Sequence, residues 1–150
     1  MLRKVLRALA VALAVIVAGA AVLYLTNAAP DTPPISAADA NDPTRPYIVK
    51  LHAQWCPVCM LTKDEWAEIE EHYADRANLL VIDSTNAATS QASATEAERL
   101  GLGDLSNRYY GATGIVVVLD GRTRDVVAEI AGNRSFDDYR AAIDAVLAAN

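Results

Sequence analysis

The chain has 150 residues, of which 53% are hydrophobic, and its formal net charge is −6. An acidic chain repels phosphate backbones, so nucleic acid is not an expected partner. Its two cysteines are too few for a small domain that several disulfides hold together. These properties leave room for one ordinary globular domain and an apolar segment outside it.

Residues 1–26 have the pattern of a membrane-targeting segment. Residues 8–25 are almost all Ala, Val, Leu or Ile, and about 18 residues suffice to cross a bilayer core. Because Arg3, Lys4 and Arg7 precede this run, we expect a single-pass membrane protein with its domain on the extracytoplasmic, periplasmic side. The lipid bilayer is then one of its partners. The alternative is a cleaved signal, since small residues at 26–28 could precede a cleavage site, and the product would be secreted or periplasmic.

Residues 27–46 are rich in proline and in small and acidic residues, which predicts an extended tether. Residues 47–150 are expected to form a single domain. Its predicted strands cover residues 47–53, 79–83, 115–119 and 125–131. Its predicted helices cover residues 57–73, 95–100 and 105–110, with a last helix that Ser135 and Asp138 open as a capping box. This order predicts an α/β fold with a mixed central sheet flanked by helices.

The motif that carries chemistry is Trp55-Cys56-Pro57-Val58-Cys59, at the junction of the first strand and the first helix. Cys56 is expected at the helix N-terminus, where free backbone N–H groups and the helix dipole favour a thiolate. Cys59 follows one turn later and is expected to be better shielded. One exposed nucleophile and one shielded thiol are the arrangement that thiol–disulfide exchange needs.

The chain resembles the thioredoxin superfamily over residues 47–150. The residues that carry this resemblance are 53–59, 110–115 before the buried strand, and Gly132. With its exported tether, it is similar to membrane-anchored, extracytoplasmic thioredoxin-like proteins. The resemblance implies that Cys56 attacks a substrate and Cys59 resolves the intermediate. It also implies that the Cys56–Cys59 disulfide is the redox group, without a further cofactor. The supporting residues of the active site would be Trp55, Pro57, Val58, Lys50 and Val116.

Two of these positions depart from the family. Val116 stands where the family usually has a cis-proline opposite the cysteines, and the Ile115–Val116 bond is expected to be trans. Lys50 stands where many thioredoxins have a buried acid beneath the cysteines. Its side chain either extends to the edge of the sheet or remains buried, with a lowered pKa, and takes the proton from Cys59.

The sequence therefore predicts a thiol–disulfide oxidoreductase that acts on exported cysteine proteins. No histidine lies between the cysteines to stabilise the thiolate, so we expect a reductant that a membrane thiol-electron carrier supplies with electrons. The alternative is a redox-inactive binding or assembly module, including one that shares a metal cluster through the cysteine pair. A zinc site within the chain is not expected, because Cys59 and His72 are about 20 Å apart along the predicted helix.

Overall fold

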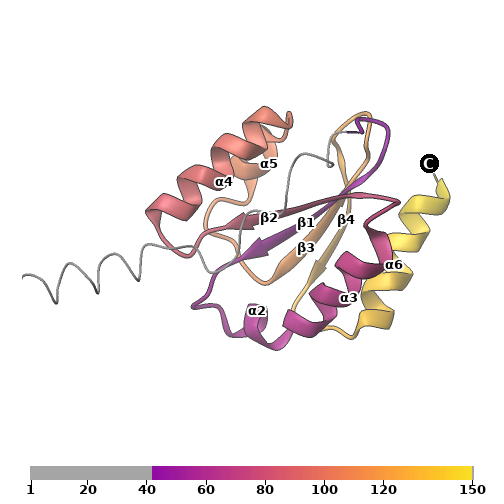
Figure 1. Ribbon diagram of the computed structural model, residues 1–150, viewed down its shortest axis with the longest axis horizontal. Coiled ribbons are helices and arrows are strands. Elements are labelled where there is room, and N and C mark those ends of the chain that lie inside the picture. Colours follow the sequence, from indigo (N-terminus) through magenta and orange to yellow (C-terminus); the bar gives the residue numbers. More distant parts are fainter. Residues whose placement is uncertain (1–41, 150) are drawn as a thin grey trace, which may run out of the picture. The chain divides into compact units, whose positions relative to one another are not determined.

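The computed structural model describes residues 42–149. The predicted membrane segment and most of the predicted tether lie outside the described residues. Residues 42–149 contain no helix that is long and apolar enough to cross a membrane. The elements follow in the order β1 (Tyr47–His52), α2 (Pro57–Leu61), α3 (Lys63–Tyr73), β2 (Asn78–Asp83), α4 (Ala87–Arg99), α5 (Gly103–Arg108), β3 (Ile115–Leu119), β4 (Val126–Ala131) and α6 (Phe136–Ala149) (Figure 1).

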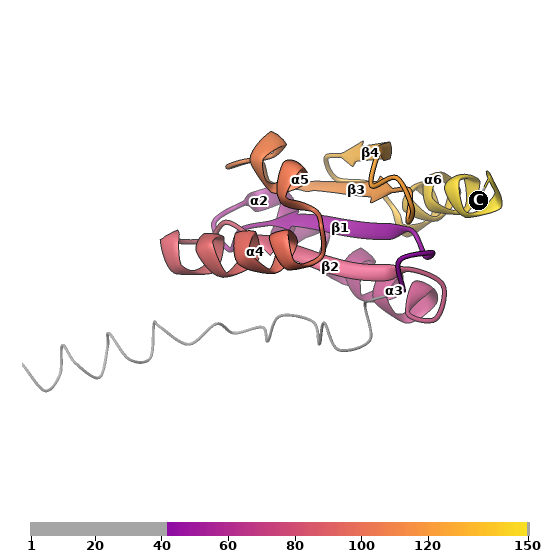
Figure 2. The same ribbon diagram turned by 90° about the horizontal axis from the view of Figure 1, so that it is seen from above.

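A four-stranded sheet forms the centre of the domain, with the strand order β2-β1-β3-β4 (Figure 2). β1 pairs in parallel with β2 and antiparallel with β3, and β3 and β4 form the predicted antiparallel hairpin. Figure 1 shows α4 and α5 on one face of the sheet and α3 and α6 on the other. This is the α/β fold with a mixed central sheet flanked by helices that the sequence predicted.

Alternation along β1 decides which side chain reaches which layer of helices. Tyr47, Val49 and Leu51 belong to the core cluster that α4 and α5 cover, whereas Ile48 belongs to the cluster that α3 and α6 cover. Successive side chains of a strand point to opposite faces, so Lys50 shares the face of Ile48. Because β1 has a strand on each side, every residue from Tyr47 to Leu51 is buried.

The predicted helix over residues 57–73 is two helices, α2 and α3, because the backbone changes direction at Thr62. Thr62 has φ −104° and ψ 25°, outside the helical range. Its hydroxyl donates a hydrogen bond to the carbonyl oxygen of Val58 at 2.9 Å. A threonine that bonds back to the preceding turn in this way bends a helix. The break separates the short helix that carries the cysteines from the longer helix that packs on the sheet.

Helix α4 is much longer than the short helix predicted at residues 95–100. Asn86 caps its N-terminus, because the side-chain oxygen of Asn86 accepts hydrogen bonds from the N–H groups of Ala88 and Thr89. The Thr89 hydroxyl in turn accepts the N–H of Asn86, which completes a capping box. Only Ala97 of this helix is fully buried, so its small residues give no apolar periodicity that would have revealed it.

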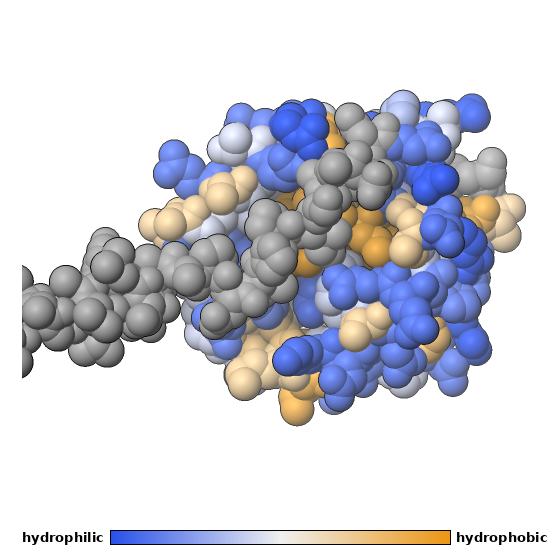
Figure 3. Space-filling view, in the orientation of Figure 1, coloured by the Kyte–Doolittle hydropathy of each residue, from blue (hydrophilic) through white to orange (hydrophobic). Residues whose placement is uncertain are grey.

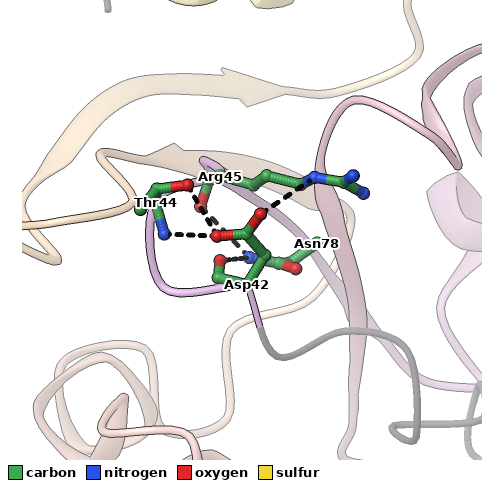
Figure 4. Close-up of polar contacts among 4 residues, drawn as sticks. All are labelled: Asp42, Thr44, Arg45 and Asn78. Carbon is green, nitrogen blue, oxygen red and sulfur yellow. Dashed lines mark hydrogen bonds and ion pairs between the residues drawn. The ribbon is translucent and has the colours of Figure 1, made fainter.

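The last residues of the predicted tether are bound to the domain at the N-terminal end of β1. The buried Asn78 side chain donates hydrogen bonds to the carbonyl oxygens of Asp42 at 2.8 Å and Arg45 at 3.1 Å (Figure 4). The Asp42 carboxylate accepts the N–H and hydroxyl of Thr44 and lies 3.4 Å from the Arg45 guanidinium. A Cβ atom on Gly121 would lie 2.3 Å from the Arg45 carbonyl oxygen, so glycine allows this close approach.

Candidate active site

The two cysteines lie beyond the C-terminal end of β1, at the start of α2. Cys56 is the N-cap of this helix, and its Sγ accepts the backbone N–H of Cys59 at 3.3 Å. Pro57 occupies the first helical turn, where its missing N–H removes no helical hydrogen bond. Both cysteines are free thiols, and they form a small buried cluster with Ala53 and the partly buried Val58. The local geometry is the one that the motif predicted.

Both thiol groups are better covered than the sequence suggested. The exposed fraction of Cys56 is 5% and that of Cys59 is 1%. The loop before β3 covers Cys56, because a Cβ atom on Gly114 would lie 3.5 Å from the Cys56 Sγ and 3.1 Å from Val58. Cys59 lies deeper, with its Sγ 3.7 Å from the carbonyl oxygen of Leu51. Cys56 is thus the less deeply buried of the two residues.

The surroundings of the two thiols shift their pKa values in opposite directions. Burial opposes ionisation of Cys56, but hydrogen bonds from the side chains of Cys59 and Thr113 and from the N–H groups of Cys59 and Val58 outweigh it, so the pKa of Cys56 is lowered. Burial raises the pKa of Cys59, and its hydrogen bond to Cys56 adds to this effect. Of the two thiols, Cys56 is therefore the one that ionises at the lower pH.

The loop that faces Cys56 consists of Thr113 and Gly114, which belong to the segment 110–115 of the family resemblance but were not predicted as site residues. Gly114 has φ +74°; its N–H donates to the Leu51 carbonyl at 2.8 Å, and its own carbonyl accepts the N–H of Gly132 at 3.2 Å. The backbone N–H and carbonyl of Thr113 have no hydrogen-bond partner among the described residues. Gly132, which contributed to the family resemblance, therefore holds the loop against the cysteines.

Val116 lies within β3, and the structure does not bring it to the cysteine cluster. It is 5% exposed and belongs to the core cluster that α3 and α6 cover. It pairs with Lys50 of β1 and with Ile130 of β4. The Ile115–Val116 peptide bond is trans, as predicted. Gly114, two residues earlier, lies against the Cys56 Sγ instead.

Trp55 borders the thiols on the surface. Its exposed fraction is 60%, and its indole N–H donates to the carbonyl oxygen of Thr85 at 3.2 Å. The hydroxyl of Thr85 also accepts the N–H of Gln54 at 2.9 Å, and the N–H of Thr85 donates to Asp83. Thr85, in the loop after β2, therefore fixes the position of the loop that leads into Cys56. Its sequence context gave no signal of this role.

Lys50 lies beneath the cysteines, on the α3 face of the central strand. Its exposed fraction is 8%, and its ammonium group lies 5.2 Å from the centre of the Trp66 ring. Burial lowers the pKa of the amine below its ordinary value, against the opposing charges of Cys59, Glu70, Cys56 and Glu65. Of the two interpretations of Lys50, the structure favours the buried amine over a side chain that extends to the edge of the sheet.

Neither histidine of the chain forms a metal site with the cysteines. The His52 side chain is half-buried, and burial, with Lys50 as the second cause, lowers its pKa. His72 lies near the C-terminal end of α3 and packs edge-on against Tyr73 and Phe136. Within residues 42–149, no group of three or more His, Cys, Asp or Glu side chains is placed to hold a metal ion.

Comparison with solved structures finds thioredoxins among the similar chains. A malaria-parasite thioredoxin-2, described as a component of the protein secretion machinery, is 17% identical over 67% of this chain and 82% of its own, with a TM-score of 0.48. The thioredoxin of Fasciola hepatica is 15% identical over 68% of this chain and 81% of its own, with a TM-score of 0.46. A malarial protein is 18% identical over 67% of this chain and 96% of its own, with a TM-score of 0.45.

No protein-family model and no curated protein matches the chain. The fold assignment rests on the strand order and pairing of this chain. The chemistry of the site rests on the geometry of Cys56 and Cys59.

Proposed function

We propose that the protein is a thiol–disulfide oxidoreductase that acts on exported cysteine proteins through Cys56 and Cys59. The observation that carries this proposal is the asymmetry of the pair. Cys56 caps a helix, has a lowered pKa and is the less deeply buried residue, whereas Cys59 is almost fully buried and has a raised pKa. A structural disulfide would need no such asymmetry, and a loop this short would contribute little stability.

The reaction proceeds in two exchange steps. The Cys56 thiolate attacks one sulfur of a substrate disulfide, a bond forms between Cys56 and that sulfur, and the other substrate sulfur leaves as a thiolate. The Cys59 thiolate then attacks the Cys56 Sγ, the mixed disulfide breaks, and the second substrate sulfur leaves. Two electrons pass from the cysteine pair to the substrate, and the protein ends as the Cys56–Cys59 disulfide.

The surface around Cys56 suits a protein substrate. Trp55, Met60 and Leu61 are large apolar residues with exposed fractions of 60%, 68% and 64%. Figure 3 shows apolar surface at the lower edge of the domain, in the region where Figure 1 shows α2. The free backbone groups of Thr113 lie beside the same thiol and can pair with an extended substrate segment. Apolar residues next to a substrate disulfide would therefore favour binding.

We further propose that the protein works as a reductant on the extracytoplasmic side of a membrane. Pro57 and Val58 supply no histidine that would stabilise the thiolate further and make the pair a strong oxidant. Exported compartments lack the thiol pool of the cytosol, so the electrons would come from a membrane thiol-electron carrier. The apolar run at residues 8–25 would hold the domain close to such a carrier.

Reduction of insulin disulfides by the full-length protein tests the activity, with dithiothreitol as the source of electrons. The wild type should accelerate the reaction and Cys56→Ser should not, because the attacking sulfur is removed. Cys59→Ser should accumulate a mixed disulfide with insulin, because the resolving thiol is missing. If the wild type and Cys56→Ser reduced insulin at the same rate, the proposal would be wrong. An inactive wild type that purified as an iron-containing dimer would favour the assembly module.

A further inference from the structure

The short loop between β1 and α2 is a turn whose two central residues are both bonded to Thr85. The N–H of Cys56 donates to the carbonyl oxygen of Ala53 at 3.1 Å and closes the turn. Gln54 and Trp55 are its central residues. The N–H of Gln54 donates to the Thr85 hydroxyl at 2.9 Å, and the indole N–H of Trp55 donates to the Thr85 carbonyl oxygen at 3.2 Å. The two residues before the attacking thiol are therefore bonded to a single residue of a neighbouring loop.

Thr85 is itself held by the segment between β2 and α4. Its N–H donates to the Asp83 carboxylate at 2.7 Å, which is the hydrogen bond of an Asx turn. The N–H of Ser84 donates to the His52 carbonyl oxygen at 2.8 Å and so continues the parallel pairing of β1 with β2. On the other side, Asn86 caps helix α4. With its neighbours fixed in this way, Thr85 presents its hydroxyl and its carbonyl to the turn after β1.

The indole ring of Trp55 is exposed, and a hydrogen bond holds it in place. Its exposed fraction is 60%, so burial in the core does not fix its position. Among residues 42–149, its side chain makes one hydrogen bond, the one to Thr85. Because Trp55 and Cys56 are adjacent in the chain, a ring that is held at Thr85 is held at a fixed place beside the thiol. A side chain that is already immobilised loses little conformational entropy when a partner binds to it.

The size of a disulfide substrate decides whether it gains from this ring. The exposed fraction of Cys56 is only 5%, so a disulfide reaches its sulfur across the residues that surround it. In a protein substrate, the chain segments beside the disulfide can contact the exposed side chains of Trp55, Met60 and Leu61. A small disulfide has no such segments. A fixed Trp55 ring should therefore assist protein disulfides more than small ones.

We propose that Thr85 is a positioning residue of the exchange reaction, which holds Trp55 beside Cys56 and thereby favours protein disulfides over small disulfides as substrates. This inference rests on the proposed oxidoreductase function and specifies its substrates further. Thr85 forms no bond to sulfur and transfers no proton in either exchange step. It acts through Trp55, so its loss should change the choice between substrates.

Single-turnover oxidation of the reduced full-length protein measures this selectivity. The protein is mixed with insulin, or with hydroxyethyl disulfide as the small disulfide, and the loss of free thiols is followed over time. Thr85→Val removes the hydroxyl that accepts the Gln54 N–H and nearly keeps the shape of the side chain. It should lower the ratio of the insulin rate to the small-disulfide rate by about three- to tenfold, which is what one immobilised side chain contributes to binding. The loss should appear as a higher insulin concentration at half-maximal rate.

Three further variants separate the hydrogen bonds from a general effect of substitution. Thr85→Ser retains a hydroxyl and should retain the wild-type ratio. Thr95→Val is the matched control, because Thr95 is an exposed residue of α4 whose hydroxyl donates to the Gln91 carbonyl within the helix. Trp55→Phe keeps an aromatic ring without the indole N–H and should lower the ratio as Thr85→Val does. A wild-type ratio in both Thr85→Val and Trp55→Phe would overturn the inference.

A double variant shows whether Thr85 acts through Trp55. Trp55→Ala removes the ring and should itself lower the ratio. Thr85→Val should lower it no further when added to Trp55→Ala, because the side chain that Thr85 holds is gone. A full further loss in the double variant would show that Thr85 acts by another route and would overturn the inference. If the wild type reacted with neither disulfide, the proposed oxidoreductase function itself would fail.

The mobility of the Trp55 indole N–H, measured by NMR relaxation, gives a readout that needs no substrate. Its order parameter should be lower in Thr85→Val than in the wild type, because the turn that carries the ring is less firmly held. The indole N–H of Trp66, which donates to the Glu70 carboxylate at 2.7 Å, is the internal reference and should not change. An equal order parameter for Trp55 in the two proteins would contradict the positioning role of Thr85.

Discussion

The backbone N–H of Cys59 donates a hydrogen bond to the Cys56 Sγ at 3.3 Å, so each of the two reactive residues influences the other before a disulfide forms. This bond favours negative charge on Cys56. Burial raises the pKa of Cys59, and the backbone hydrogen bonds from Ala53 and Gly114 do not offset it. The difference between the attacking and the resolving thiol therefore arises from burial, which hydrogen bonds outweigh at Cys56 but not at Cys59.

The lowered pKa of Cys56 should depend on the hydrogen bond from the Thr113 hydroxyl. Because the folded protein lowers the pKa of Cys56, its alkylation by iodoacetamide should persist at a lower pH than that of an ordinary cysteine and fall as the pH drops below that lowered pKa. Thr113→Val removes a donor and should move the alkylation profile to higher pH, whereas Thr113→Ser should leave it in place. Superimposable profiles for Thr113→Val and the wild type would show that the hydroxyl does not stabilise the thiolate.

Glycine should be needed at position 114 for two reasons: its positive φ, and the close approach of the backbone to Val58 and Cys56. Gly114 and Gly111 both have φ +74°, but a Cβ atom would lie 3.1 Å from Val58 at Gly114 and would meet nothing within 4 Å at Gly111. Gly111→Ala should cost about 1–2 kcal/mol of unfolding free energy from backbone strain alone. Gly114→Ala should cost more and should also slow the reaction of Cys56 with a bulky maleimide. Equal losses in urea unfolding, with equal maleimide rates, would argue against this contact.

Asn78 should contribute stability by holding residues 42–45 against the sheet (Figure 4). Asn78→Ala leaves two carbonyl oxygens without their buried donor, at a cost of about 1–3 kcal/mol. Asn107→Ala, at an exposed position of α5, should change the unfolding free energy by less than about 0.5 kcal/mol. Denaturant unfolding of both variants measures the difference. Proteolysis should also begin near Thr44 sooner in Asn78→Ala, and an unchanged cleavage pattern would mean that the two hydrogen bonds do not hold this segment.

The N-terminal apolar run should keep the protein in a membrane. The full-length chain should remain in the membrane fraction after a high-salt wash, because burial of residues 8–25 is hydrophobic and not electrostatic. Protease added from the extracytoplasmic side should digest the domain. Recovery of a soluble exported form that begins near Ala29 would show that the segment is a cleaved signal.

Several elements of this protein follow from local patterns along the chain. The apolar residues of β1 and β3, the hairpin between β3 and β4, and the capping box of Ser135 and Asp138 all form as predicted. So does the Cys56 N-cap, because its geometry depends on Pro57 and on the turn that immediately follows it. Interactions within a few residues set these features, and the amino-acid sequence displays such interactions directly.

Other features depend on residues that are distant along the chain. The pairing of Leu51 with Ile115 decides that Thr113 and Gly114, and not Val116, meet Cys56. Lys50 is buried because β2 and β3 flank its strand and α3 covers its face, which no pattern around residue 50 reveals. Helix packing and strand register are long-range, and a shift of one residue would turn each side chain of a strand to the opposite face. The tertiary structure alone therefore decides which groups the two thiols meet.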